Sequence, residues 1–296
     1  MEFKQWMHEK TSKVENSLNK AVEVKNNPQK IIYEAMNYSL MSGGKRIRPV
    51  LMLGAYEIFN DDDEKILPFA CALEMIHTYS LIHDDLPAMD DDDYRRGRLS
   101  NHKKFDEATA ILAGDALLNK AFETGLEAVI EFDLDVKRAM RALSVIGNSS
   151  GTEGMIGGQI VDIFGNEKIK SVEELKYMYS LKTGAIIKSS VVAGAILGGA
   201  NECEIDALEK FAEKIGLAFQ IEDDILDVTG TQEKLGKPIG SDIANEKITY
   251  LSFVEIEEAK KHVVKLTDEA IDSLKMFGGK SNYLVALAKY LTDRDH

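Results

Sequence analysis

The residues with the clearest chemical potential are the carboxylates crowded into residues 83–97, HDDLPAMDDDDYRRG. The segment before them, residues 70–82, is apolar at helical spacing. Carboxylates at the end of a buried helix repel one another, and each desolvated one is costly unless it is neutralised. Mg²⁺ can neutralise them, because it binds one or two carboxylates and completes its shell with water and phosphate oxygens. The aspartates are Asp84, Asp85, Asp90, Asp91, Asp92 and Asp93.

A second acidic cluster lies far along the chain, in residues 219–227, FQIEDDILD. Asp223 and Asp227 stand at i and i+4 and share one helix face, with Asp224 beside them. The neighbouring residues are apolar and imply burial. An ordinary acidic run, such as residues 61–64 (DDDE), is more simply a solvated loop between helices. Two buried clusters instead predict two helix ends that face each other across a gap holding metal ions and an anion.

Several basic residues lie in short segments of a chain that is acidic as a whole. Residues 43–49, GGKRIRP, place Lys45 and Arg48 between two helices, and arginine binds phosphate oxygens in a bidentate manner. His77 precedes Asp84 by about two helical turns and shares its face. A basic loop or a helix histidine is more simply a surface or core group, but beside the aspartates these residues predict direct binding of a polyanionic phosphate. Further candidates are Arg95, Arg96, Lys182 in a KTG segment, Lys237 and Lys247.

Composition limits the function classes. The formal net charge of −14 over 296 residues argues against nucleic-acid binding, which requires a basic face. Cys71 and Cys203 are too few for a disulfide framework and lack metal-site spacing, so we expect a reducing, cytoplasmic environment. The N-terminal residues lack the apolar core of a signal peptide. The apolar run 191–200 is shorter than the ~20 residues that span a bilayer, so we expect no membrane span.

The hydrophobic pattern predicts an almost entirely helical chain. No segment alternates like an exposed strand, and no Asn-Gly or Asp-Gly pair marks a hairpin. No composition break or repeat divides the chain, so we expect a single domain over residues 1–296. Helices are expected at 2–25, 28–42, 48–60, 64–84, 104–131, 134–149, 152–164, 171–184, 184–199, 203–228, 248–266, 267–276 and 281–293.

Some polar and glycine residues inside these helices need a reason. Asp115, in LAGDALL, is expected to be buried with a structural partner. Gly154, Gly157 and Gly158, in GMIGGQ, each cost about 1 kcal/mol relative to alanine within a helix. Such a cost is tolerated where backbones pack tightly or a ligand approaches closely. The glycines therefore predict either tight helix packing or a ligand contact.

The order GGKRIRP, IHTYSLIHDDLPAMDDDDYRRG, GMIGGQIVD, KTG and FQIEDDILD resembles the trans-isoprenyl diphosphate synthases, most of all the short-chain bacterial farnesyl diphosphate synthases. The resemblance implies an all-α isoprenoid synthase (terpenoid synthase) fold, a helical bundle around a central cavity, usually as a homodimer. It implies head-to-tail condensation of isopentenyl diphosphate with an allylic diphosphate by ionisation, condensation and elimination. The cofactor implied is Mg²⁺, in several ions, with Mn²⁺ as a substitute.

The resemblance also implies roles for individual residues. The isopentenyl diphosphate ligands would be Lys45, Arg48, His77 and Arg96. The allylic diphosphate would be held by Arg95, Lys182 and Lys237. Thr183 and Gln220 would lie beside the developing cation, and Asp162 would orient Lys182. Lys247 is followed by Ile248 where the family commonly has serine or threonine, which leaves the role of Lys247 open. The metal ligands would be Asp84, Asp85, Asp90 and Asp223, with Asp224 and Asp227 close by.

Product length should depend on what closes the hydrocarbon shaft. Tyr79 and Ser80 lie about one turn before Asp84, or ~5–6 Å deeper along the helix. In the family that this chain resembles, a bulky residue at this position goes with a C15 product when the first motif is extended and contains Pro87. The resemblance therefore implies a C15 product from dimethylallyl or geranyl diphosphate. Alternatives are a geranylgeranyl diphosphate synthase, a class I terpene cyclase, a phosphohydrolase using His83 and Asp84, and a non-catalytic metal-binding subunit.

Overall fold

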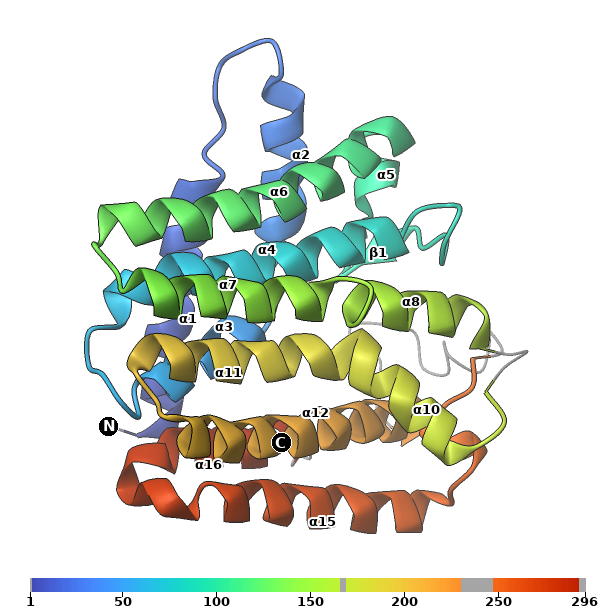
Figure 1. Ribbon diagram of the computed structural model, residues 1–296. Coiled ribbons are helices and arrows are strands. Elements are labelled where there is room, and N and C mark those ends of the chain that lie inside the picture. The colour runs from blue at the N-terminus through green and yellow to red at the C-terminus, as the bar shows by residue number, and fades with distance from the viewer. Residues whose placement is uncertain (1, 166–168, 230–246, 293–296) are drawn as a thin grey trace.

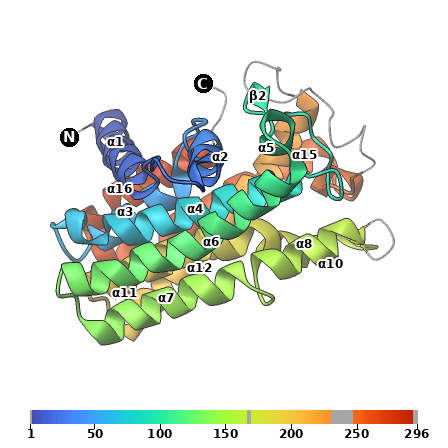
Figure 2. The same cartoon turned by 90° about the horizontal axis from the view of Figure 1, so that it is seen from above.

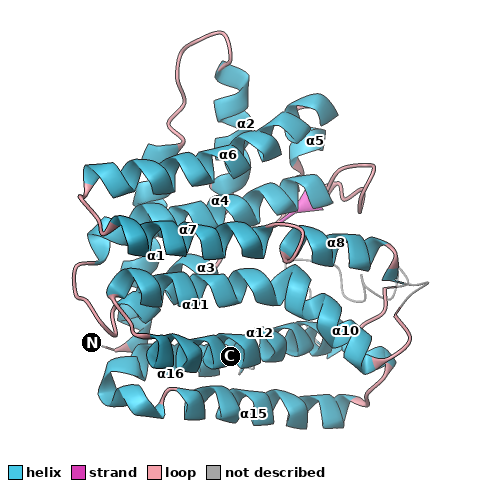
Figure 3. Cartoon of the chain, viewed as in Figure 1, coloured by secondary structure: helices cyan, strands magenta, loops and turns pink. Residues whose placement is uncertain are grey.

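The computed structural model describes residues 2–165, 169–229 and 247–292 of the chain. Figure 3 shows that nearly all of this is helix, as the sequence predicts. The helices are α1 (Phe3–Ala21), α2 (Lys30–Leu40), α3 (Ile47–Tyr56), α4 (Leu67–Asp84), α5 (Asn101–Lys104), α6 (Glu107–Glu131), α7 (Val136–Ser150), α8 (Met155–Ile163), α10 (Val172–Tyr179), α11 (Ala185–Gly198), α12 (Glu202–Thr229), α15 (Ile256–Ser273) and α16 (Asn282–Thr292). Shorter turns are η1 (Asp63–Ile66), η2 (Ser180–Gly184), η3 (Tyr250–Ser252) and η4 (Lys275–Ser281).

The long helices form stacked layers with α4 and α11 at the centre (Figures 1 and 2). Helix α4 packs on α6, α11 packs on α3 and α7, and α12 packs on α11 and α15. The two central helices are apolar on every side, which is the pattern of a helix enclosed by others. Their composition is therefore consistent with the central position of both helices.

The apolar character of α11 extends through the helix before it. The continuous helix Val172–Gly198 is long and apolar enough to cross a membrane by length and composition. Within the bundle, 61% of its apolar window is buried, and α11 is in contact with α3, α7 and α12. These contacts account for its composition as a core helix.

A short β-hairpin follows the first aspartate cluster, and the expectation of no hairpin was wrong. Strands β1 (Tyr94–Arg95) and β2 (Arg98–Leu99) are antiparallel, with Arg95 opposite Arg98. The two turn residues have positive φ, 53° at Arg96 and 73° at Gly97, as a type I′ turn requires. An Arg-Gly pair makes this turn, so the sequence lacks the Asn-Gly or Asp-Gly pair that usually signals a hairpin.

Two other expectations were also wrong. The segments 248–266 and 267–276 do not form two helices, because α15 runs unbroken from Ile256 to Ser273. Asp115 is exposed rather than buried. Helix α6 turns Ala113 and Leu117 into the core, which leaves Asp115 on the outer face.

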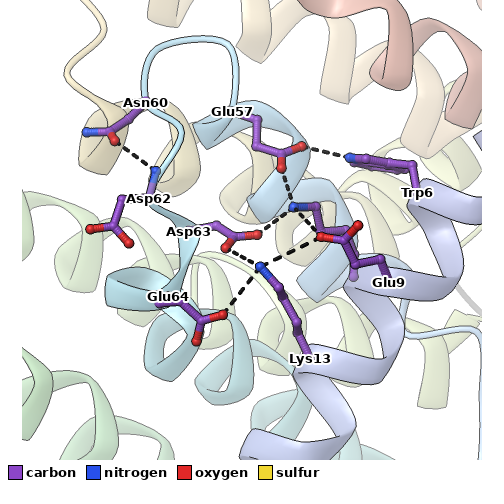
Figure 4. Close-up of polar contacts among 9 residues, drawn as sticks. Trp6, Glu9, Lys13, Glu57, Asn60, Asp62, Asp63 and Glu64 are labelled. Atoms are coloured by element: carbon purple, nitrogen blue, oxygen red, sulfur yellow. Dashed lines mark hydrogen bonds and ion pairs between the residues drawn. The ribbon is translucent and has the colours of Figure 1, made fainter. Parts of the chain in front are cut away.

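A buried ionic cluster attaches α1 to the turn between α3 and α4 (Figure 4). Lys10 Nζ is 2.5 Å from Asp63 Oδ2 and also pairs with Glu57, while Lys13 Nζ is 2.7 Å from Asp63 Oδ1. Trp6 donates its indole N–H to Glu57 at 2.7 Å. Burial disfavours the ionised form of Asp63, but hydrogen bonds from Lys10 and Lys13 outweigh it and lower its pKa. The acidic run 61–64 is therefore not wholly a solvated loop, because Asp63 is buried in η1.

Candidate functional site

The two aspartate clusters lie on the same side of the bundle. The C-terminal ends of α4 and α12 point toward the same end of the molecule in both views (Figures 1 and 2). Lys247 Nζ is 3.2 Å from Asp90 Oδ2 in the first cluster, and the Tyr250 N–H donates to Asp224 Oδ2 in the second at 2.8 Å. Three residues of extended chain span at most about 10 Å. The short segment 247–250 therefore contacts both aspartate clusters.

The carboxylates at the end of α4 are held by basic and amide groups. Asp84 accepts a hydrogen bond from Gln159 Nε2, and Asp85 accepts one from Arg95 Nε at 2.9 Å. Burial raises the pKa of Asp84 to about 6, with Lys182 opposing and the negative charge of Asp90 adding to the rise. Burial likewise raises the pKa of Asp85, although Arg95 opposes it. Burial therefore makes ionisation of these two carboxyl groups costly, and an added positive charge would offset that cost.

A divalent cation would supply that positive charge. Hard cations bind carboxylate oxygens and stabilise their ionised form. In the described part of the chain, no group of three His, Cys, Asp or Glu side chains is arranged to hold a metal. Carboxylate oxygens are the kind of donor that Mg²⁺ prefers, but Asp84 and Asp85 are turned toward their protein partners Gln159 and Arg95.

The members of the second cluster differ in burial. Asp223 is partly buried, and its negative charge acts on the buried guanidinium of Arg48. Asp224 and Asp227 are buried, and Asp224 accepts hydrogen bonds on both carboxylate oxygens. Asp223 is thus the member closest in electrostatic terms to the basic residues of the GGKRIRP segment.

Three of the predicted isopentenyl diphosphate ligands come together. Burial lowers the pKa of Arg48, and Arg96 lowers it further. Burial also lowers the pKa of His77 well below its usual value, with Arg48 and Arg96 adding to the effect. His77 is therefore neutral at physiological pH, and a neutral imidazole offers a ligand hydrogen bonds but no charge. Lys45 is exposed, and its ammonium lies 5.7 Å from the ring centroid of Tyr290 in α16.

The hairpin turn aims Arg96 at the glycine pair that precedes α3. Arg96 donates from Nη1 to the carbonyl of Gly43. A Cβ on Gly44, which has φ 126°, would lie 2.7 Å from Arg96 Nη1. Glycine at this position therefore serves close packing as well as positive φ. The neighbouring Arg46 instead donates to Glu74 at 2.7 Å and is a buried structural residue.

A π-helical turn presents the KTG residues. η2 interrupts the continuous helix of α10 and α11 and carries Lys182 and Thr183, and such turns are frequent at functional sites. Lys182 Nζ is 2.5 Å from Asp162 Oδ2 on α8, as predicted. A Cβ on Gly158 would overlap the Lys182 main-chain nitrogen, so this glycine allows close backbone packing. Lys237 lies outside the described residues.

The two residues expected to set product length lie on the α4 side of the site. Tyr79 is buried, and its ring centroid is 5.8 Å from that of His83. Burial and the nearby charge of Asp84 raise the pKa of Tyr79 to about 12. Ser80 donates a hydrogen bond to the carbonyl of His77 at 2.9 Å. Tyr79 is thus a neutral, bulky side chain below the aspartate cluster.

A model of the polyprenyl synthetase family matches residues 29–281. The chain belongs to the polyprenyl synthetase family. Its resemblance to trans-isoprenyl diphosphate synthases is thereby confirmed, and it is a prenyltransferase. The all-helical architecture is the fold of this family.

Individual members of the polyprenyl synthetase family are similar along the whole chain. The farnesyl diphosphate synthase of Micrococcus luteus is 43% identical over 281 residues, covering 95% of both proteins. The geranylgeranyl diphosphate synthase of Cyanophora paradoxa is 44% identical over 292 residues, covering 98% of this chain and 96% of that protein. The apo crystal structure of an FPP/GFPP synthase from Zymomonas mobilis has a TM-score of 0.87 and 36% identity over 98% of each chain. The chain is thus similar to synthases with different named products.

Sequence reasoning missed three residues of this polyprenyl synthetase site. Gln159 follows the GMIGG glycines directly, but only the glycines were interpreted. Tyr179 lies just before the KTG segment and Tyr250 lies 26 positions after Asp224, and neither was predicted to belong to the site. Their contacts with Asp224 depend on tertiary packing between α10, α12 and η3, for which the sequence carries no local signal.

Proposed function

We propose that this chain is a Mg²⁺-dependent synthase that condenses isopentenyl diphosphate with dimethylallyl or geranyl diphosphate to give farnesyl diphosphate and diphosphate. The observation that carries the proposal is the short segment 247–250, which contacts both aspartate clusters. One diphosphate group can therefore meet acidic metal ligands and basic side chains from both helix ends. The bacterial relatives named as farnesyl diphosphate synthases support the product.

Each part of the site has a role in this reaction. Asp84, Asp85, Asp90 and Asp223 would hold Mg²⁺, which would supply Lewis-acid stabilisation of the leaving diphosphate. The allylic diphosphate is bound by Arg95, by Lys182 as oriented by Asp162, and by Lys237 and Lys247. Such preorganised donors stabilise the charge that develops as the allylic C–O bond ionises.

The second substrate is bound on the basic side of the site. Arg48 and Arg96 provide charged donors for isopentenyl diphosphate, neutral His77 provides a further hydrogen bond, and Lys45 approaches from solvent. The isopentenyl double bond attacks C1 of the allylic cation, beside Thr183 and Gln220. The apolar surroundings exclude water, which would otherwise capture the cation. The proton is then lost to the released diphosphate, so no dedicated side-chain base is required.

Tyr79 forms the floor of the hydrocarbon shaft in this proposal, and Ser80 is too small to do so. A C15 product then follows, because the chain stops growing when it meets the buried ring. A geranylgeranyl product is the second candidate, since a relative with that name is 44% identical to this chain. The two candidates share the same chemistry and differ only in the number of condensations.

The chain is also proposed to act as a cytoplasmic homodimer. The outer face of α6 exposes Ile111, Leu112 and Ile130, the last with 86% of its surface accessible. Large exposed apolar side chains along one helix are consistent with a protein interface. Sedimentation equilibrium should give a dimer mass, and Ile130→Glu should shift it toward the monomer; a monomeric unaltered protein would refute the assembly.

One experiment tests the function directly. The purified protein is incubated with labelled isopentenyl diphosphate, each allylic starter and Mg²⁺, and the products are separated by chromatography. We expect farnesyl diphosphate and strict dependence on isopentenyl diphosphate. Products of twenty carbons or more would overturn the farnesyl assignment. Turnover of the allylic substrate alone would indicate a cyclase, phosphate release a phosphohydrolase, and no turnover a non-catalytic subunit.

A further inference from the structure

Asp224 receives three hydrogen-bond donors from three separate elements. Tyr179 in α10 donates its hydroxyl to Oδ2 at 2.5 Å, and the main-chain N–H of Tyr250 in η3 donates to the same oxygen at 2.8 Å. Gln220, one turn earlier in α12, donates from Nε2 to Oδ1 at 3.2 Å. Only 4% of the residue surface is exposed. Both oxygens are therefore engaged by protein donors in a place that solvent hardly reaches.

This arrangement fixes the orientation of the Gln220 amide. An ionised carboxylate accepts hydrogen bonds and cannot donate them, so the amide must turn its NH₂ group toward Asp224. The amide oxygen then points the other way, where it accepts a hydrogen bond from Thr183 Oγ1 at 3.0 Å. The hydrogen bond to Asp224 thus determines which way the Gln220 amide faces.

The same reasoning extends to the hydroxyl of Thr183. A hydroxyl has one hydrogen and two lone pairs, and the hydrogen of Thr183 is used by Gln220. Thr183 can therefore present only lone pairs to any further group in the site. Lone pairs attract a positive charge, whereas a hydroxyl hydrogen would repel it. The chain of bonds from Asp224 thus determines the sign of the dipole that Thr183 turns toward an allylic cation.

We propose that Asp224 is a positioning residue rather than a metal ligand, and that Tyr179 and the Tyr250 main chain hold it so that Gln220 and Thr183 present lone pairs to the reacting cation. This inference rests on the proposed function for the identity of that cation. It separates Asp224 from its neighbour Asp223, whose charge acts on Arg48 across the site. Adjacent residues of one motif thereby have different tasks.

The first test compares Asp224→Asn with Tyr179→Phe. Both should lower kcat by about 10- to 100-fold, the value of one hydrogen bond to a charged group, with KM for the allylic substrate nearly unchanged. The Mg²⁺ concentration for half-maximal rate, and Mn²⁺ binding followed by electron paramagnetic resonance with inorganic diphosphate present, should stay within twofold of the unaltered protein. Tyr177→Phe, at an exposed position of the same helix, is the matched control and should change neither quantity.

A second pair of variants tests the role of the Thr183 hydroxyl. Thr183→Ser keeps the hydroxyl and should retain most of kcat, whereas Thr183→Val keeps the shape and should lose as much as Asp224→Asn. Equal activity of the serine and valine variants would overturn the proposal. So would a tenfold weaker Mn²⁺ affinity in Asp224→Asn with unchanged affinity in Tyr179→Phe, because that pattern identifies a metal ligand.

A stability measurement separates this inference from the proposed function. Urea unfolding of Tyr179→Phe, Asp224→Asn and the double variant should show losses that are smaller together than their sum, because Tyr179→Phe removes the donor and Asp224→Asn removes the charge of the same hydrogen bond. Additive losses would overturn the inference. This result is read without any substrate, so it holds even if the unaltered protein makes no prenyl diphosphate. Cooperative unfolding of each variant verifies that it is folded.

Discussion

The ammonium of Lys247 lies 3.2 Å from a carboxylate oxygen of Asp90, a residue 157 positions earlier in the chain. Both side chains are about one-third exposed. The pair joins the segment after the second aspartate cluster to the last metal-ligand candidate of the first. A diphosphate with its metal ions would compete for both partners, so Lys247 can exchange a carboxylate for a phosphate without moving far.

This pair predicts the effect of removing Lys247. Lys247→Ala should raise KM for the allylic diphosphate by about tenfold, because one charged donor to the diphosphate is lost. Lys275→Ala removes an exposed lysine that pairs with Asp272 at 2.7 Å and is the matched control, with no change expected. Steady-state kinetics at saturating isopentenyl diphosphate measures both. An unchanged KM in Lys247→Ala would leave this lysine without a role in substrate binding.

The metal assignment predicts large effects at the two clusters. Asp84→Ala and Asp223→Ala should each lower kcat by about 10²- to 10³-fold, the scale of one preorganised electrostatic contact, while folding is retained. Asp91→Asn, at an exposed position in the same loop, should keep most activity. The rates are measured over a Mg²⁺ titration. Full activity of Asp84→Ala would end the metal assignment.

The proposal that Tyr79 closes the hydrocarbon shaft predicts that its removal changes the product. Tyr79→Ala removes a buried ring and should give products longer than fifteen carbons, because the shaft deepens. The substitution should also destabilise the protein by about 3–5 kcal/mol, as large-to-small core changes do. Tyr56→Ala, another buried tyrosine, controls for lost stability and should leave product length unchanged. Reversed-phase chromatography of the dephosphorylated products decides, and an unchanged C15 product would show that Tyr79 is only a core residue.

Close backbone packing at Gly158 predicts a sensitive position in α8. Gly158→Ala would force the Lys182 main chain to move, and a shift near 1 Å should lower kcat/KM by about 10- to 100-fold. Gly147→Ala is the control, because its Cβ would lie 3.6 Å from Phe122 in ordinary contact. That variant should gain about 0.5–1 kcal/mol of stability from helix propensity. Equal activity of the two variants would contradict the packing argument.

The ionic cluster of α1 predicts a stability effect away from the site. Lys10→Met leaves the buried Asp63 with fewer donors and should cost about 3 kcal/mol of unfolding free energy at pH 7. Lys4→Met, at an exposed position of the same helix, should change it little. Chemical unfolding measures both, and equal stabilities would contradict a structural role for the cluster.

The cluster also predicts a pH dependence. The pKa of Asp63 is lowered in the folded protein, so its contribution is fully present above the unfolded pKa near 4 and is lost as pH falls through the folded value. The unaltered protein should therefore lose stability steeply below about pH 4, and Lys10→Met should show a shallower slope there. Parallel slopes would show that Lys10 does not lower the pKa of Asp63.

The sequence was most informative where chemistry and local pattern coincide. The aspartates at the helix ends and the basic segment before α3 follow from residue type and helical spacing, whereas the Asp162–Lys182 pair was expected only from the family resemblance. It was least informative where tertiary packing decides. The buried state of Asp63 depends on Lys10 from another helix, and the role of Asp224 depends on two tyrosines from other elements. The hairpin turn was missed because Arg96 adopts a positive φ that arginine rarely takes.

Helix α8 contacts both sides of the site. It touches the Lys182 main chain through Gly158, binds the Lys182 ammonium through Asp162 and binds Asp84 through Gln159. No side chain separates the two backbones at Gly158, so a shift of α8 moves the Lys182 main chain with it. We therefore expect α8 to keep the distance between Lys182 and Asp84 nearly constant when a diphosphate group binds. Any tolerance for hydrocarbon tails of different size must reside deeper along α4.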